Sequence, residues 1–262
     1  MEWCDKWRVQ VNPDKCFFIH YIPINSKKDQ IPVYKIQNHV LQRKSQAKDL
    51  GVTISEDLKF HKHISNICAT TQREINRIKR TFVTRSPKFL RNLHKIYVRP
   101  HLEYCANVWN STYQTDITKI EKTQNKFTKL LKHGDVMTPE ERNRYLNITT
   151  HKERRDRGDL ITTYKCIENE NLFQRGTDRN RAHGRRIFHE KNIKKEFCRT
   201  DIRRHSFAVR VADSWNNLPS NVVNADTLTN FKIELGKNQE TRVIKKRPEN
   251  TEETTQTRLS RS

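Results

Sequence analysis

The fold is decided by residues 61–82, which read HKHISNICATTQREINRIKRTF. Apolar side chains recur there every three or four positions, the spacing that places residues on one face of an α-helix. They are Ile64, Ile67, Cys68, Ile75, Ile78 and Phe82. The stretch therefore predicts a long amphipathic helix. His61 and His63 are predicted to be polar residues at its start, because no cysteine or carboxylate pair lies near them at metal-ligand spacing.

The helical period continues to about residue 235. Ser86-Pro87 predicts the start of a second helix, and Thr138-Pro139-Glu140-Glu141 has the form of a capping box. Asp116 is predicted to cap a helix that stops near Gly134, and a final short helix is predicted to end at Gly236. The chain beyond Gly236 is polar and weakly patterned, which predicts a disordered tail.

Two further features of this helical region are read as structural. Trp109 and Trp215 lie in apolar stripes, so we expect core burial, with base stacking as the alternative. Arg99 and Glu103 are four residues apart and are expected to pair on one helix face. Residues 170–200 are polar and basic and predict a long excursion.

Residues before about 60 have a different pattern. Short aromatic and β-branched runs between turn residues predict strands at 16–22, 31–36 and 50–54. Trp3 and Trp7 are four residues apart, which suits the end of an amphipathic helix. The expected fold is therefore mostly α, with a small β-rich N-terminal part followed by an all-helical region.

The composition favours a polyanionic partner. The 262 residues include 52 Lys and Arg against 30 Asp and Glu, a formal net charge of +22. Nucleic acid is the commonest partner of such a chain, and a basic protein without a specific partner is the alternative. No stretch is long and apolar enough to span a membrane, and the N-terminus lacks the pattern of a secretory signal.

The cysteines and glycines exclude several kinds of site. The 6 cysteines are far apart, which indicates free thiols in an intracellular protein, nuclear or cytoplasmic, with disulfides as the alternative. No paired ligands at short spacing predict a metal site. Only 6 glycines are present, and neither a phosphate-binding loop, a dinucleotide fingerprint nor a nucleophile elbow can be found. We therefore predict no catalytic residue from motifs.

Several strings, in order along the chain, resemble a known family. Asn12-Pro13-Asp14-Lys15-Cys16 and Lys48-Asp49-Leu50-Gly51-Val52 are similar to the end of the palm of non-LTR retrotransposon reverse transcriptases, the LINE-like and jockey-like elements. Arg99-Pro100-His101-Leu102-Glu103-Tyr104 resembles the segment after that palm. Trp215-Asn216-Asn217-Leu218-Pro219 resembles the C-terminal signature of the family. The resemblance extends to about Phe231.

This resemblance implies an RNA-directed DNA polymerase that uses magnesium held by palm aspartates. The chain contains no Asp-Asp pair, and its first residues correspond to the region after the catalytic turn. The catalytic carboxylates and the fingers are therefore expected to be missing, and the chain alone is expected to be inactive. The implied parts are a palm remnant with a primer-grip-like hairpin at 1–60, a thumb-like bundle at 61–135, a basic helical region at 136–236 and the tail at 237–262.

The implied partners are RNA, DNA or their hybrid, together with the upstream palm and fingers of the parent polymerase. By resemblance, Lys15 corresponds to a lysine near the leaving phosphate, and Leu50 with Gly51 corresponds to the primer grip. The alternatives are a turn lysine facing water and an ordinary hairpin glycine. Candidate contacts to the nucleic-acid backbone, each with a solvated helix face as the alternative, are Arg73, Arg77, Lys79, Arg80, Arg91, Lys95, Arg154, Arg155 and Arg157.

Two other functions stay open at this point. The chain could be a host protein of retroelement origin that binds nucleic acid without catalysis, or a gene-model fragment without function. Lys245-Lys246-Arg247 is a short basic run that is weak evidence for nuclear import.

Overall fold

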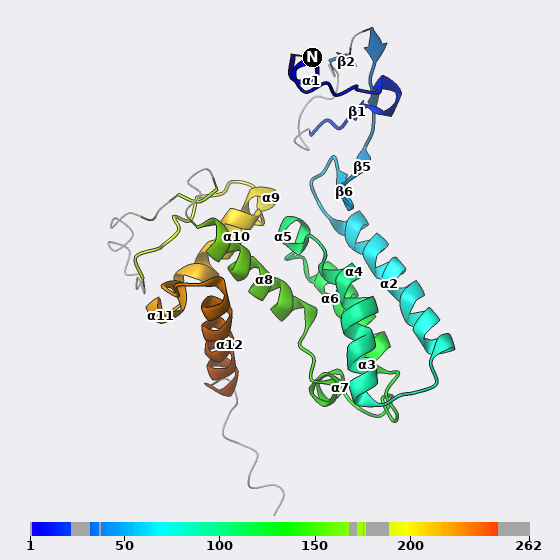
Figure 1. Cartoon of the computed structure of the whole chain (residues 1–262), viewed down its shortest axis with the longest axis vertical. Helices are drawn as coiled ribbons and strands as arrows, with labels where there is room; N and C mark the ends of the chain where they lie inside the picture. Colours follow the sequence, from blue (N-terminus) through cyan, green and yellow to red (C-terminus); the bar gives the residue numbers. More distant parts are fainter. Residues whose placement is uncertain are drawn as a thin grey trace, which may run out of the picture. The chain divides into compact units, whose positions relative to one another are not determined.

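The computed structural model describes residues 2–21, 32–36, 38–167, 172–174, 176 and 189–245 (Figure 1). It confirms a mostly helical chain with a small β-rich N-terminal part. The chain divides into two compact units. Unit 1 contains residues 1–155 and 200–205, and unit 2 contains residues 156–199 and 206–262. Lys246 and Arg247, from the basic run noted above, lie outside the described residues.

The start of unit 1 consists of short elements. Helix α1 (Glu2–Lys6) and the 3-10 turn η1 (Pro13–Lys15) precede three two-stranded sheets. The sheets pair β1 (Phe17–Phe18) with β4 (Gln42–Arg43), β2 (Lys35–Ile36) with β3 (His39–Val40), and β5 (Gln46–Asp49) with β6 (Val52–Ser55). The first pair is parallel and the other two are antiparallel.

The predicted strands were too long. The strand expected at 16–22 is only Phe17–Phe18, and the one expected at 31–36 is only Lys35–Ile36, because each has just two residues of a partner strand to pair with. Ile22 and Ile31 lie outside the described residues. The strand expected at 50–54 begins at Val52, because Leu50 and Gly51 form the turn before it.

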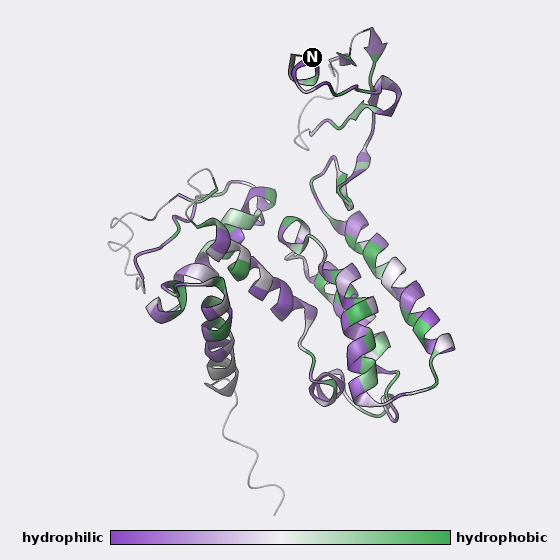
Figure 2. Cartoon of the chain, viewed as in Figure 1, coloured by the Kyte–Doolittle hydropathy of each residue, from purple (hydrophilic) through white to green (hydrophobic). Residues whose placement is uncertain are grey.

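The helices of unit 1 pack around one apolar core. They are α2 (His61–Thr81), α3 (Pro87–Leu93), the π-helical turn η2 (His94–Val98), α4 (Arg99–Glu103), α5 (Ala106–Trp109), α6 (Gln114–Thr128), α7 (Pro139–Leu146) and the start of α8 (His151–Cys166). The predicted long helix is confirmed as α2, which begins at His61 and buries Ile64, Cys68, Ile75 and Ile78. Alternating bands of hydrophobic and hydrophilic residues along α2 are visible in Figure 2.

Trp109 belongs to this core and is fully buried, as predicted. Its indole N–H donates to the carbonyl of Tyr104 at 2.6 Å. Burial of a ring of this size is among the largest single contributions to a small core. α2 and α6 run in the same direction, because His61 contacts Asp116 while Ser65, one turn later, contacts Lys119.

Two helix boundaries differ from the prediction. The residue before α6 is Tyr113. Asp116 lies inside the first turn, buried, where it accepts a hydrogen bond from the Ser111 hydroxyl and pairs with His61 at 2.7 Å. The predicted cap was therefore wrong, because the carboxylate is bound by the loop residue Ser111 and by His61 of α2. α6 ends at Thr128 rather than near Gly134, and turns follow it.

The other predicted starts are confirmed. Ser86 precedes α3, with Pro87 at its first position, although the Ser86 side chain makes no capping hydrogen bond. Thr138 and Glu141 form the predicted capping box of α7. Thr150 and Glu153 make the same reciprocal pair at the start of α8, at 3.1 and 3.2 Å.

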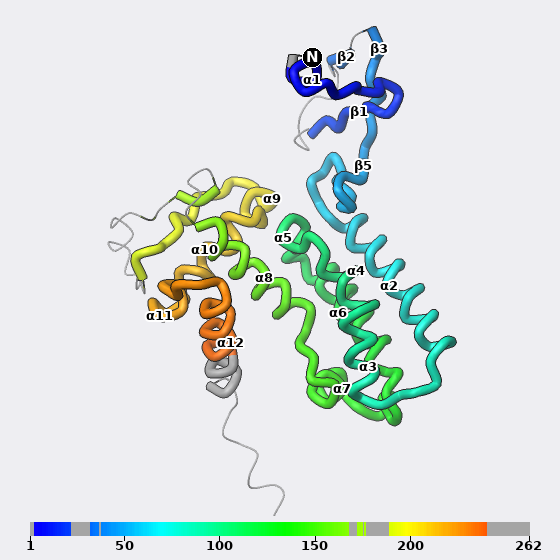
Figure 3. Tube along the Cα trace, in the orientation of Figure 1, coloured from blue at the N-terminus to red at the C-terminus, as the bar shows by residue number. Residues whose placement is uncertain are grey.

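Unit 2 is built from the remainder of α8, α10 (Phe207–Asn216), α11 (Ser220–Val223) and α12 (Leu228–Lys245), whose order along the chain can be followed in Figure 3. Its core includes Val211, Leu218 and Phe231 around the fully buried Trp215. The short α9 (Asp201–Arg204) is assigned to unit 1. The predicted end of the last helix at Gly236 was wrong: α12 continues to Lys245, because a helical glycine costs only about 1 kcal/mol.

Candidate nucleic-acid interface

The hairpin β5–β6 has an exposed apolar tip. Leu50 and Gly51 form its two-residue turn, with φ values of +43° and +89°. Two positive φ values are typical of the turn that suits the twist of a hairpin. Leu50 is 83% exposed. The Tyr104 hydroxyl donates to the Leu50 carbonyl at 3.1 Å, and its ring lies 3.0 Å from where a Cβ on Gly51 would be. The hairpin tip is therefore fixed against the end of α4.

Strand β6 of this hairpin is attached to α2. Val52 is buried in the core, and the backbone N–H of Thr53 donates to Nδ1 of His63 at 3.2 Å. Burial, together with the charge of Lys48, lowers the pKa of His63 and keeps the ring neutral, so that Nδ1 can accept this bond. The hairpin and the long helix are therefore joined through the core and through this hydrogen bond.

The exposed face of α2 is basic. Arg73, Arg77 and Arg80 are separated by four and three residues, which places them on the face opposite the buried isoleucines. Lys79 is also exposed. The helix carries five Lys and Arg side chains and a single carboxylate, Glu74, which pairs with Arg77 at 2.5 Å. Arg73 and Arg80 make their hydrogen bonds to neutral groups, at 3.0 and 3.4 Å.

Cations from α3 and η2 adjoin this face. The Arg77 guanidinium lies 5.8 Å from the ring centroid of Tyr97 in η2, which links α2 to η2. Lys95 in η2 is exposed, and Arg91 in α3 is half-buried. Among the described residues neither side chain has a hydrogen-bond or ion-pair partner, and the segment 87–98 contains no carboxylate. Arg77, Arg91 and Lys95 are thus predicted site residues that the structure places on packed neighbouring elements.

A row of lysines on α6 was not predicted. Lys119, Lys122 and Lys126 are exposed and separated by three and four residues, opposite the buried Ile120 and Phe127. The Lys119 ammonium donates to the Ser65 hydroxyl of α2 at 2.6 Å, so the row begins at the junction of the two parallel helices. The spacing of these lysines was the signal that could have revealed them.

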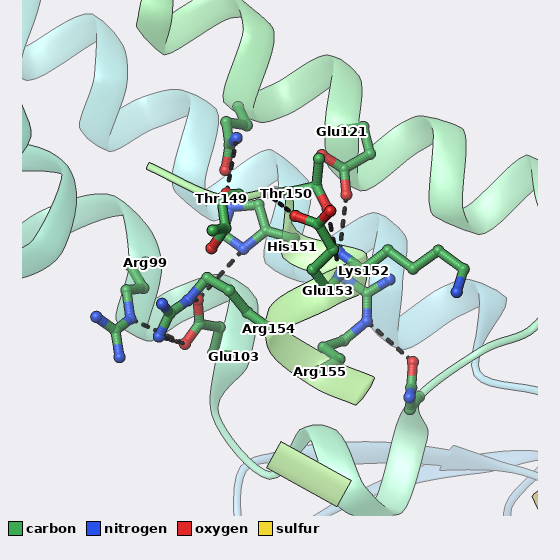
Figure 4. Close-up of polar contacts among 12 residues, drawn as sticks. Arg99, Glu103, Glu121, Thr149, Thr150, His151, Lys152, Glu153, Arg154 and Arg155 are labelled. Carbon is green, nitrogen blue, oxygen red and sulfur yellow. Dashed lines mark hydrogen bonds and ion pairs between the residues drawn. The ribbon is translucent and has the colours of Figure 1, made fainter. Parts of the chain in front are cut away.

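The basic cluster at the start of α8 has internal partners (Figure 4). Arg154 donates to the carboxylate of Glu103, 3.2 Å from Nη2 to Oε2. Arg99 donates to the same carboxylate at 2.9 Å, which confirms the predicted Arg99–Glu103 pair. Arg155 is buried and donates to Oδ1 of Asn110 at 2.9 Å. Arg157, which belongs to unit 2, donates to the Lys232 carbonyl at 2.8 Å.

Glu103 is therefore a shared partner of several cationic side chains and does not belong to a free surface. Burial alone would raise its pKa, but the adjacent His151, 3.5 Å from Oε1, and the hydrogen bonds and charge of Arg154 outweigh it and lower the pKa to about 2. The neighbouring His94 is buried, and burial with the charge of His151 lowers its pKa to about 3. Because Arg155 is inside the fold, we leave it out of the proposed interface.

Lys15, the last predicted site residue, ends the turn η1 and is exposed. The side-chain oxygen of Asn12 accepts from the backbone N–H of Asp14 at 3.0 Å and caps this turn. Within the described ranges, no group of three or more His, Cys, Asp or Glu side chains is placed to hold a metal ion. The described residues therefore form no magnesium centre, and we assign no metal-dependent step to them.

Comparisons with known proteins identify relatives. Over 128 residues the chain is 30% identical to the RNA-directed DNA polymerase from mobile element jockey of Drosophila funebris. The matched region covers 48% of this chain and 14% of that protein. About half of this chain is similar to mobile-element RNA-directed DNA polymerases. The predicted resemblance to the non-LTR retrotransposon enzymes is thereby confirmed for that half.

Two further relatives are also RNA-directed DNA polymerases from transposons. The probable RNA-directed DNA polymerase from transposon X-element of Drosophila melanogaster is 26% identical over 137 residues, and that from transposon BS of the same organism is 25% identical over 132 residues. They cover 50% and 47% of this chain. In each case the match spans only 14% of the relative's own length. No family model and no solved structure matches the chain.

No helix in the described part of the chain has the length and apolar character needed to cross a membrane.

Proposed function

We propose that this chain is a segment of a non-LTR retrotransposon reverse transcriptase that binds the phosphate backbone of RNA, DNA or their hybrid. Half of the chain is similar to such polymerases, which supports the parent activity as RNA-directed DNA polymerisation. The match covers 14% of those proteins, so polymerisation is proposed for the parent protein and backbone binding for this segment.

The excess of cations on the exposed helices of unit 1 carries this proposal. α2 has five Lys and Arg side chains with one carboxylate, and residues 87–98 add three more cations with none. The α6 lysines begin at the α2–α6 junction. Lysine and arginine on a rigid surface neutralise phosphates and release condensed counterions, which supplies affinity without sequence preference.

In this proposal each segment of the chain has the role that the resemblance implies. Residues 1–60 are the palm end, whose hairpin tip at Leu50 and Gly51 contacts the primer end, with Lys15 near a phosphate. Residues 61–135 act as the thumb, and residues 136–236 as the C-terminal region. The exposed Trp3 and Trp7, at 64% and 60%, support a further partner surface for the upstream palm and fingers.

Fluorescence anisotropy with a labelled RNA–DNA hybrid at two salt concentrations tests the proposal. We expect binding at low salt that weakens steeply as salt rises, because log K falls linearly with log salt for each phosphate neutralised. The double variants R73Q/R80Q and K122Q/K126Q should each reduce the salt slope by about two. Absence of binding by the unmodified chain at low salt would contradict the proposal.

A charge-matched control separates a defined surface from bulk charge. Lys165 and Lys232 are exposed residues of unit 2, and K165Q/K232Q removes the same two charges. We expect this variant to bind nearly as the unmodified chain does. If it weakens binding as much as the unit 1 variants, the basic face of α2 and α6 is not the interface.

A further inference from the structure

Phe197 is the most exposed aromatic residue in the described part of the chain. Its exposed fraction is 89%, whereas the next, Trp3, is 64% exposed. An exposed phenylalanine side chain contributes little to the stability of the fold, because its apolar surface stays hydrated. Phe197 belongs to the segment 194–199 of unit 2, outside the basic face described above.

The segment that leads to Phe197 is bound firmly to α10. The Asn216 side chain donates to the Ile193 carbonyl at 2.8 Å and accepts from the Ile193 N–H at 2.9 Å, as a neighbouring strand would. The Trp215 indole N–H donates to the Lys191 carbonyl at 2.8 Å. The motif Trp215-Asn216 is thus a clamp that holds residues 191–193.

A further contact with α10 lies two residues before Phe197. The Lys195 ammonium pairs with the Asp213 carboxylate on α10. Beyond Phe197, the Cys198 thiol contacts the Glu196 carbonyl at 3.5 Å. The backbone on the N-terminal side of the ring is therefore anchored, and the ring is presented outward at a defined place instead of on a free end.

Cations flank the exposed ring. Lys194 and Arg199 are both exposed, three residues before and two residues after Phe197. Lys194 makes a long hydrogen bond to Gln174, 3.4 Å, which leaves its ammonium at the surface. An exposed aromatic ring with exposed cations close to it in sequence suits a ligand that carries both phosphates and open π-faces.

We propose that Phe197, with Lys194 and Arg199, forms a second nucleic-acid site that binds single strands by stacking on an unpaired base. Bases inside a duplex have both faces covered by their neighbours, so a duplex offers nothing for this ring. A single strand exposes its bases, and stacking on an aromatic side chain is tolerant of sequence. The site uses none of the residues proposed for the unit 1 interface.

The test uses the full chain and two labelled probes, a short single-stranded oligothymidylate and a DNA duplex of equal length. We expect F197A to bind the single strand about 5- to 100-fold more weakly and the duplex with unchanged affinity. F197W should retain single-strand binding, because it keeps an aromatic face. F197L should lose it, because it keeps an apolar side chain without one.

Two control measurements make each outcome decisive. I233A removes another half-exposed apolar side chain of unit 2, on α12, and should leave both affinities unchanged. Thermal melting of F197A should match that of the unmodified chain, since the ring is hydrated in the fold. Single-strand affinity that is unchanged in F197A, or fully retained in F197L, overturns the proposal, as does an equal loss for both probes.

Discussion

The hydroxyl of Tyr104 donates to the carbonyl of Leu50 at 3.1 Å, across 54 residues of sequence. The same ring lies against Gly51, so one side chain holds both residues of the hairpin turn. Leu50 adopts a left-handed backbone, φ +43°, which a residue with a Cβ rarely adopts, and its side chain is almost fully hydrated. Strained and exposed apolar residues of this kind concentrate at functional sites.

We expect G51A to destabilise the fold by about 1–2 kcal/mol. The new Cβ would lie 3.0 Å from Cε1 of Tyr104, and φ at this position is +89°. G236A is the matched control, because Gly236 is in α12 with nothing within 4 Å of its added Cβ. There we expect stabilisation of about 0.5–1 kcal/mol. Chemical denaturation of both variants measures the difference, and equal effects would contradict the strain at Gly51.

We expect L50N to increase the stability of the fold while it weakens nucleic-acid binding. Asparagine tolerates the left-handed region better than leucine, so the free energy of unfolding should rise by about 0.5–1 kcal/mol. Affinity for a primer–template hybrid should fall, because the apolar tip is lost. Denaturation and anisotropy on the same preparation give both values. A variant that is more stable and binds as tightly as before would remove Leu50 from the proposed interface.

The hairpin illustrates what the sequence could and could not predict. The primer-grip resemblance predicted a hairpin at Leu50 and Gly51, and the structure has a hairpin turn there. Nothing local pointed to Tyr104 as its support, because that contact joins residues 54 positions apart. The α2 helix could be predicted almost to the residue because its pattern is periodic over six turns, whereas two-residue strands leave too little pattern to delimit.

The basic residues of α8 show the same limit for the site. Arg154, Arg155 and Arg157 are the densest helical cluster of cations, and density alone favoured a nucleic-acid contact. Their partners, Glu103, Asn110 and the Lys232 carbonyl, are 45 to 75 residues distant in sequence. A sequence pattern shows the positions of the charged residues, but not which carboxylates, amides or carbonyls they contact in the folded chain. The α6 lysines were overlooked for the opposite reason, since they are spread over two turns.

We expect E103Q to destabilise unit 1 by up to about 3 kcal/mol at neutral pH. Glu103 has a folded-state pKa of about 2, below its usual 4.5. Its stabilisation is therefore complete above pH 4.5 and is lost as the pH falls from about 4.5 towards 2. Melting curves of both proteins across this range should converge at the acid end. E74Q, which breaks an ion pair with the exposed Arg77, should cost at most about 1 kcal/mol and serves as the control.

We expect N216A to release the segment 191–195 from α10. The substitution leaves the N–H and the carbonyl of Ile193 without the two bonds that they make to Asn216, and each lost buried bond costs about 1–3 kcal/mol. Trypsin should then cleave after Lys194 or Lys195 faster than in the unmodified chain, because a protease needs a locally opened backbone. N224A, which changes an exposed asparagine after α11, should leave the cleavage rate unchanged. If N216A is as resistant as N224A, the clamp does not hold this segment, and the fixed presentation of Phe197 loses its support.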